Sequence, residues 1–197
     1  TRFGFKSRGL GDVYKRQPEG YSVNARGQAM IDAFDLNDSP ALNCEPASVP
    51  SITLAPYTHR WIREADRIVI EKDQSEQVRI IHLDGSPMPE DWVPDLLGYS
   101  VGHFEADGSL VVETTGFAPT TWGIVRGIDS SAAKKVTERF ELAADGYEMK
   151  VSITVEDPEY LTEPHTRTGG YDKIRDHEFS SVPCDPETAR RHLQFED

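Results

Sequence analysis

The stretch GYSVGHFEADGSLVVETTGF, residues 98–117, constrains the fold most strongly, because it has the pattern of a β-hairpin. Two segments within it, Val101–Glu105 and Ser109–Thr115, are rich in β-branched and aromatic residues, which favour strands. Asp107 and Gly108 lie between them. A three-residue loop that ends at Gly108 lets this glycine take the left-handed conformation at little steric cost. The pattern therefore predicts two antiparallel strands.

The register of this hairpin separates an apolar face from a polar one, because side chains alternate along a strand. The apolar face is expected to hold two cross-strand pairs, Phe104 with Leu110 and Gly102 with Val112. The opposite face carries His103, Glu105, Val111 and Glu113. The polar residues of this face are either solvated or line a polar pocket, which makes His103, Glu105 and Glu113 candidate ligand-binding residues.

A second hairpin, Lys135–Leu142 with Tyr147–Glu156, places a carboxylate on an apolar face. Its expected register is Leu142 with Tyr147, Phe140 with Met149, Glu138 with Val151 and Val136 with Ile153. A carboxylate on such a face must be paired, hydrogen-bonded or protonated. Glu138 is therefore the candidate catalytic acid or base, because burial shifts a carboxylate towards the pKa that proton transfer needs. The alternative is a structural salt bridge or a position near the sheet rim. Arg139 faces the other way.

The rest of the chain completes a mainly β domain. Further strands are expected at His59–Glu64, Arg67–Lys72, Glu76–Leu83 and Tyr171–Val182, and loops at 86–97, 118–134 and 161–170. Residues 40–57 contain four prolines and are expected to form a strap over the sheet. About eight strands with one or two terminal helices predict an antiparallel, lipocalin-like β-barrel. A two-sheet sandwich is the alternative.

Three aromatic residues are candidate pocket residues. Trp92 and Trp122 lie in expected loops, where each either plugs one end of the barrel or stacks on a ligand. Tyr160 follows the second hairpin and is expected to line the pocket with Trp122 and Glu113.

The first 17 residues differ from the rest of the chain. They hold five of the 21 basic residues and one of the 34 acidic ones. The string DVYKRQ within them resembles the translation of an adapter used in preparing sequencing libraries. Residues 1–17 are therefore interpreted as a non-native leader, and residues 18–197 as one barrel domain. An ordinary basic tail is the alternative. The true start, with any signal peptide, is expected to be missing from this chain.

Composition excludes several classes of protein. A net charge of −13 over 197 residues argues against general binding to nucleic acid and against docking to anionic lipid. No apolar run approaches the length of a membrane span. The six histidines show no metal-ligand spacing, and no zinc, nucleotide or nucleophile motif occurs. We therefore expect no metal and no cofactor.

The two cysteines, Cys44 and Cys184, lie near the ends of the expected domain. One interpretation is a disulfide that closes a long loop, worth roughly 4–5 kcal/mol in the chain-entropy model. A disulfide would indicate an oxidising compartment. The alternative is two unrelated buried thiols.

Several motifs together resemble a family of uncharacterised bacterial proteins, usually exported. They are RIIHLDGSPMPEDW, the hairpin at residues 98–117, TW, VTERF and ITVEDPEYLTEP, and the likeness covers about residues 40–184. Matching positions are Asp84, Gly85, Gly98, Ser100, Gly102, Glu105, Gly116, Phe117, Trp122, Glu138, Arg139, Asp157, Pro158 and Tyr160. The family also tends to have cysteines at positions like those of Cys44 and Cys184.

The chain departs from this family pattern in places. Met88 and Tyr99 stand where the family often has histidine, and Gly127-Ile128-Asp129 replaces a stretch that contains histidine. Any family chemistry that uses those histidines is in doubt for this chain. The resemblance implies a fold, a pocket and export, and it implies no reaction.

The leading hypothesis is an exported protein, periplasmic or extracellular, that binds a small apolar or amphiphilic molecule, because an eight-stranded barrel can hold one small ligand. The second is an isomerase, lyase or hydratase of the same fold that uses Glu138. The third is an interaction module with a filled core. Enzymatic activity and oligomeric state stay open, and the expected partner is a small molecule, without nucleic acid or membrane.

Overall fold

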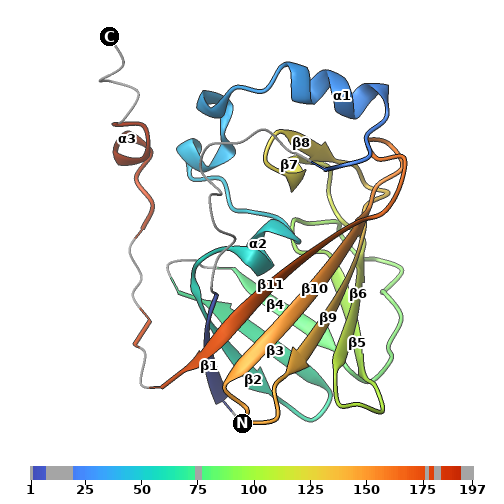
Figure 1. Ribbon diagram of the computed structural model, residues 1–197, viewed down its shortest axis with the longest axis vertical. Coiled ribbons are helices and arrows are strands. Elements are labelled where there is room, and N and C mark those ends of the chain that lie inside the picture. The colour runs from blue at the N-terminus through green and yellow to red at the C-terminus, as the bar shows by residue number, and fades with distance from the viewer. Residues whose placement is uncertain (1, 8–19, 74–76, 176–177, 180–182, 192–197) are drawn as a thin grey trace.

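Nine strands close into a barrel in the computed structural model, which describes residues 2–7, 20–73, 77–175, 178–179 and 183–191 (Figure 1). The order around the barrel is β1-β11-β10-β9-β6-β5-β4-β3-β2. The strands are β1 (Arg2–Ser7), β2 (Thr58–Arg63), β3 (Arg67–Lys72), β4 (Val78–His82), β5 (Tyr99–Phe104), β6 (Leu110–Thr115), β9 (Lys135–Leu142), β10 (Glu148–Glu156) and β11 (His165–Ile174). The closed barrel confirms the prediction of a barrel rather than a sandwich.

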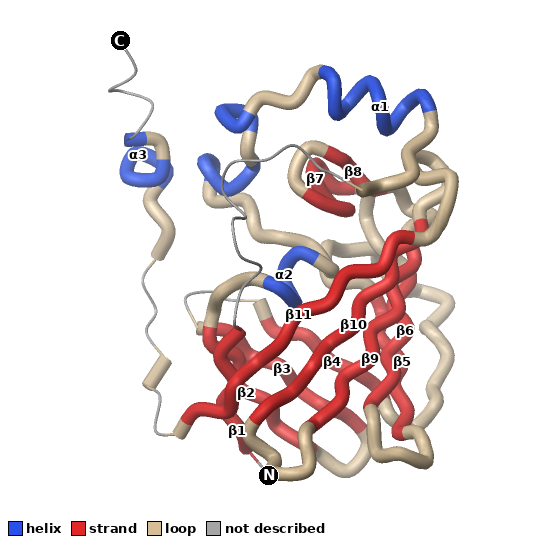
Figure 2. Tube along the Cα trace, in the orientation of Figure 1, coloured by secondary structure: helices blue, strands red, loops and turns tan. Residues whose placement is uncertain are grey.

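Short helices and a small sheet gather at one end of this barrel (Figure 2). The elements are α1 (Ala25–Asp32), the 3-10 turns η1 (Leu36–Asp38) and η2 (Pro40–Asn43), α2 (Ser51–Leu54), α3 (Pro186–Ala189), and the two-stranded sheet of β7 (Thr120–Val125) and β8 (Ile128–Ser130). The hairpin turns of β5–β6 and β9–β10 lie at the opposite end (Figure 1). No described helix is long and apolar enough to span a bilayer.

The registers of the two hairpins explain which side chains face inward. In β5–β6, Phe104 pairs with Leu110 and Gly102 with Val112, as expected. In β9–β10 the expected register is wrong by two residues, since Ile153 and not Val151 lies opposite Glu138. A shift of two leaves every side chain on its original face, so the inward orientation of Glu138 is unaffected.

The barrel is mixed rather than wholly antiparallel. Strands β4 and β5 run parallel and pair only at Ile81 with Ser100 and at His82 with Val101. The connection 83–98 passes back along the barrel before β5 begins, as parallel neighbours require. The prediction of an entirely antiparallel barrel is therefore wrong at this one junction.

Two expected loops contain strands. Residues 118–134 include β7 and β8, and β11 begins at His165, within the expected loop 161–170. The predicted last strand, 171–182, ends at Ile174, and residues 176–177 and 180–182 lie outside the described residues. Gly169, which lies within that expected loop, has a packing role in β11: a Cβ at this position would lie 2.7 Å from Cδ2 of Leu54. The glycine leaves room for α2 against the barrel wall.

The excluded leader contributes to the barrel. Its residues Arg2–Ser7 form β1, which pairs with both β11 and β2. Phe5 is buried, and its ring meets the edge of the Trp61 ring at a centroid distance of 5.9 Å. Leaving residues 1–17 out of the fold was therefore wrong for β1, while the non-native origin of this stretch stays a prediction.

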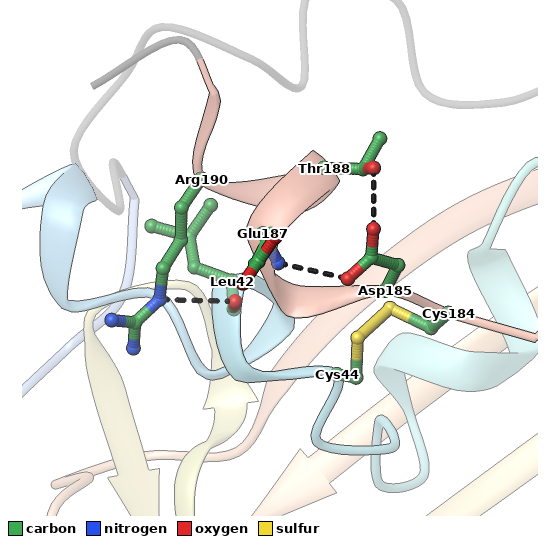
Figure 3. The surroundings of a disulfide bond; sticks show 7 residues. All are labelled: Leu42, Cys44, Cys184, Asp185, Glu187, Thr188 and Arg190. Atoms are coloured by element: carbon green, nitrogen blue, oxygen red, sulfur yellow. Dashed lines mark hydrogen bonds between the residues drawn. A yellow bond between two sulfur atoms is a disulfide. The ribbon is translucent and has the colours of Figure 1, made fainter. Parts of the chain in front are cut away.

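The predicted disulfide is confirmed: Cys44 and Cys184 are bonded with an S–S distance of 1.99 Å and a Cα–Cα distance of 5.7 Å. Cys44 is the residue that ends η2, and Cys184 directly precedes Asp185, the N-cap of α3, so the bond joins these two elements (Figure 3). Beside it, Nε of Arg190 donates a hydrogen bond of 3.3 Å to the carbonyl of Leu42. The covalent bond thus holds the C-terminal helix against the strap.

Candidate functional site

Helix α2 lies in the mouth of the barrel and places Ile52, Thr53 and Leu54 in buried positions. It has four residues and no side-chain cap at its start. A helix this short is not stable by itself in water. Its helical conformation therefore depends on contacts with the barrel wall.

Three polar residues of the barrel wall hold α2 in place. Lys72 Nζ on β3 donates to the carbonyl of Ile52, and Tyr171 Oη on β11 donates to the carbonyl of Thr53. The Thr53 hydroxyl donates in turn to Oε1 of Glu138 on β9, at 2.6 Å. We call these three contacts the α2 latch.

Glu138 points into the barrel, as its position on the apolar face predicted, and its partner is Arg79 on β4. The two side chains are 0 % and 5 % exposed and form a salt bridge through both carboxylate oxygens. Arg79 also donates to Ser100 Oγ at 3.1 Å and to Thr114 Oγ1 at 2.9 Å. Because Arg79 and Thr53 use both oxygens of Glu138, the arrangement supports the structural salt bridge, and the catalytic role of Glu138 stays a hypothesis.

Lys72 is a second buried cation in this layer, and no carboxylate among the described residues lies within ion-pair distance of it. Burial, reinforced by the positive charge of Arg79, holds the pKa of Lys72 well below its usual range, while Glu138 opposes the shift. The ammonium donates one hydrogen bond within the described chain, to Ile52. Its burial without a carboxylate partner in the described chain makes Lys72 a candidate ligand-binding group.

A small cavity lies beneath α2 with room for about one water molecule. Apolar side chains such as Ile70 and Phe140 form part of its wall. Its polar lining consists of Thr53, His59, Trp61, Lys72, Gln77, Arg79 and Tyr171. Two of its nitrogens, Nε2 of His59 and Nε1 of Trp61, are buried without a hydrogen-bond partner in the described chain. Since nearly all buried polar atoms are hydrogen-bonded, this cavity is the candidate site.

His59 predicts a loss of stability in acid. Burial, with the charges of Lys72 and Arg79, lowers the pKa of His59 from 6.5 to about 2. Between these two pH values the imidazole is protonated in the unfolded state and neutral in the folded state. The free energy of unfolding is therefore unaffected by His59 above pH 6.5, and it decreases as the pH falls from 6.5 towards 2. At about 1.4 kcal/mol per pH unit, the titration of His59 lowers the free energy of unfolding by about 2 kcal/mol between pH 6.5 and pH 5.

Urea unfolding at pH 7 and pH 5 measures this loss. The His59→Gln variant should lose about 2 kcal/mol less than the wild type between the two pH values, whereas His103→Gln, at an exposed position, should match the wild type. Equal losses in wild type and His59→Gln would contradict the prediction.

The predicted ligand-binding residues of the first hairpin lie outside the barrel. His103, Glu105 and Glu113 are exposed. Glu105 pairs with Arg139 at 2.5 Å, and Glu113 with Lys135 at 3.3 Å. The outward orientation of Arg139 agrees with the prediction. These charged side chains therefore lie on the solvated outer face of the barrel, where two of them form ion pairs.

The three aromatic candidates also lie away from the cavity lining. Trp92 donates from Nε1 to the carbonyl of Gly116 at 2.9 Å, and Trp122 on β7 packs against Phe34 at a ring distance of 5.5 Å. Tyr160 is buried after β10, with the guanidinium of Arg26 over its ring. The structure brings none of the six predicted ligand-binding residues to Glu138.

The residues that form the cavity were missed by sequence reasoning. Lys72 had a usable signal, since it shares the inward alternation of Ile68 and Ile70 along β3. Arg79 had none, because β4 presents Ile81 inward and Val78 and Ile80 outward, so both faces of this strand are apolar.

Comparison of the chain with protein-family models, with curated proteins and with solved structures gives no match. The function must therefore be argued from the cavity and its chemistry.

Proposed function

We propose that the barrel binds one small amphiphilic molecule, whose hydrogen-bond-accepting head group reaches the polar cavity beneath α2. The observation that carries this proposal is that three residues with buried nitrogens line this one cavity: Trp61 and His59, whose Nε1 and Nε2 have no hydrogen-bond partner in the described chain, and Lys72. A buried polar group without a partner costs about 1–3 kcal/mol. Convergent polar groups at the end of an apolar interior are typical of a ligand site.

The size of the cavity makes α2 part of the site. Room for about one water is too little for an amphiphile, but Ile52, Thr53 and Leu54 occupy the mouth above it. Displacement of this short helix opens the interior, where side chains such as Ile70 and Phe140 offer an apolar surface to a ligand tail.

The interaction module with a filled core is the second candidate. The small cavity favours it, as does the pairing of Glu138 with Arg79. In that case the polar layer serves only to hold α2, and the function resides on the outer surface.

The disulfide supports a location in an oxidising compartment, since such bonds persist in the periplasm or outside the cell. We propose export to one of these, in keeping with the exported bacterial family that the motifs resemble. A lipocalin-like role in carrying or sequestering the ligand fits this location and the barrel.

Native mass spectrometry of the purified protein, followed by a thermal-melting screen of amphiphiles, tests the binding proposal. A ligand at 100 times its Kd should stabilise the fold by about 2.7 kcal/mol, which is about 5–10 °C in Tm for a chain of this size. Trp61→Phe, which removes the indole N–H, should weaken binding.

Trp92→Phe is the matched control, because Nε1 of Trp92 binds the Gly116 carbonyl outside the cavity. It should leave the affinity unchanged. The absence of a copurified molecule together with a flat screen would favour the filled interaction module instead.

A further inference from the structure

The charge balance of the interior identifies the class of head group. The charges of Arg79 and Glu138 neutralise each other in a buried salt bridge. Lys72 is equally buried and has no carboxylate partner among the described residues. A buried charge is stable only when it is paired and hydrogen-bonded. The described chain supplies no carboxylate to Lys72, and burial holds the pKa of this amine well below its usual range, so an acidic ligand would both protonate and pair it.

A second buried lysine, Lys134, shows how this protein satisfies a buried amine with acceptors from the chain itself. Lys134 Nζ donates to Ser48 Oγ at 2.7 Å, to the Val49 carbonyl at 2.8 Å and to the Gly123 carbonyl at 3.1 Å. All three of its N–H groups have acceptors. Lys72 lines the cavity and donates only to Ile52 within the described chain. Unlike the amine of Lys134, the amine of Lys72 therefore has capacity left for an acceptor from a ligand.

The α2 latch marks where an acceptor group fits. Lys72 and Tyr171 donate to two successive carbonyl oxygens, those of Ile52 and Thr53. A carboxylate also has two acceptor oxygens, and it supplies the negatively charged partner that Lys72 lacks in the described chain. Relative to the peptide carbonyls, it makes stronger, charge-assisted hydrogen bonds with the same two donors.

We propose that the ligand is a monocarboxylate with an apolar tail, whose carboxylate replaces the Ile52 and Thr53 carbonyls on Lys72 and Tyr171 and so displaces α2 from the barrel mouth. This inference rests on the proposed function and names its ligand class. Arg79 is engaged by Glu138, and burial with two neighbouring cations keeps His59 neutral by lowering its pKa to about 2. Among the described residues of the cavity lining, Lys72 therefore offers one positive charge when it is protonated by the ligand, which matches one carboxylate, whereas a phosphate dianion needs more positive charge.

Matched ligand pairs test the head group separately from binding itself. Straight-chain alkanoates and alkanols, from butanoate with butanol to tetradecanoate with tetradecanol, are titrated calorimetrically into the wild type, Lys72→Met and Lys135→Met. We expect the best alkanoate to bind the wild type about 10- to 100-fold more tightly than its alkanol, as one charged hydrogen bond implies. Lys72→Met should abolish that preference. Lys135→Met, whose lysine pairs with Glu113 on the outer face, should retain it.

The outcomes separate the two proposals. Equal affinity for alkanoate and alkanol would overturn the carboxylate inference and leave amphiphile binding intact, as would an alkanoate preference that survives Lys72→Met. Binding of neither series would overturn the carboxylate inference, and a flat result in the broader amphiphile screen would then overturn the proposed function as well.

Hydrogen exchange in the wild type supplies a readout that needs no variant to fold. The amides of Ile52 and Thr53 bond to the carbonyls of Ser48 and Pro50 at 2.9 and 3.0 Å, so docked α2 is protected. A saturating alkanoate should accelerate exchange in residues 48–57 while protection of the barrel strands rises. Unchanged or slower exchange in residues 48–57 would overturn the displacement of α2.

Discussion

Replacement of Glu138 by leucine is expected to lower the free energy of unfolding by about 3–5 kcal/mol, the usual cost of breaking a buried ion pair. The substitution leaves the Arg79 guanidinium, which is 5 % exposed, without a counter-ion in the barrel. It also removes the acceptor of the Thr53 hydroxyl. Urea unfolding, followed by circular dichroism, measures the loss.

The double variant Arg79→Met/Glu138→Leu should recover most of this loss. Replacing both partners of a buried pair by apolar residues of similar volume is often neutral or stabilising, and Ser100 and Thr114 keep their own hydrogen bond of 2.9 Å. Arg139→Met is the matched control on the same strand. It removes ion pairs to Glu105 and Asp107 that are exposed, so its expected cost is within about 1 kcal/mol. A single Glu138→Leu loss as small as that of Arg139→Met would contradict the buried pair.

Removal of the Cys44–Cys184 disulfide by the double alanine variant is expected to lower the free energy of unfolding by about 3–5 kcal/mol. The bond joins residues with a sequence separation of 140. A loop of this length loses much conformational entropy in the unfolded chain, and the chain-entropy model gives about 5 kcal/mol as the upper value. Urea unfolding of the oxidised wild type and the variant, both without reductant, measures the difference.

Reductant provides the control for this second prediction. Reduced wild type should match Cys44→Ala/Cys184→Ala, while the variant should not respond to reductant, because it has no cysteine. A loss of less than 1 kcal/mol would mean that the C-terminal segment detaches from η2 without affecting the barrel, and that the cross-link restrains only this segment.

Local alternation predicted much of the fold. The β5–β6 register followed from the Asp107-Gly108 turn, and Glu138 faces inward because it shares the parity of Val136 and Phe140. Parity survives an error of two residues in register, as the β9–β10 pair shows. The start of β11 was missed because residues 161–170, which include Gly169 and Gly170, were expected to form a loop, and glycine is uncommon within strands. The packing reason for Gly169, its approach to Leu54, is not visible in the local sequence.

The sequence by itself determined that the chain forms paired strands, that one carboxylate turns inward, and that two distant cysteines can meet. These properties depend on side-chain alternation, turn residues and composition, which are local. Only the tertiary structure decided that Arg79 meets Glu138, that β4 and β5 run parallel, and that α2 sits over Lys72 and Tyr171. These contacts join segments that are far apart in the chain, so the closure of the barrel decides which side chains meet. Closure removes the interior from water, and each buried charge or hydrogen-bonding group is then stable only with a partner inside the barrel.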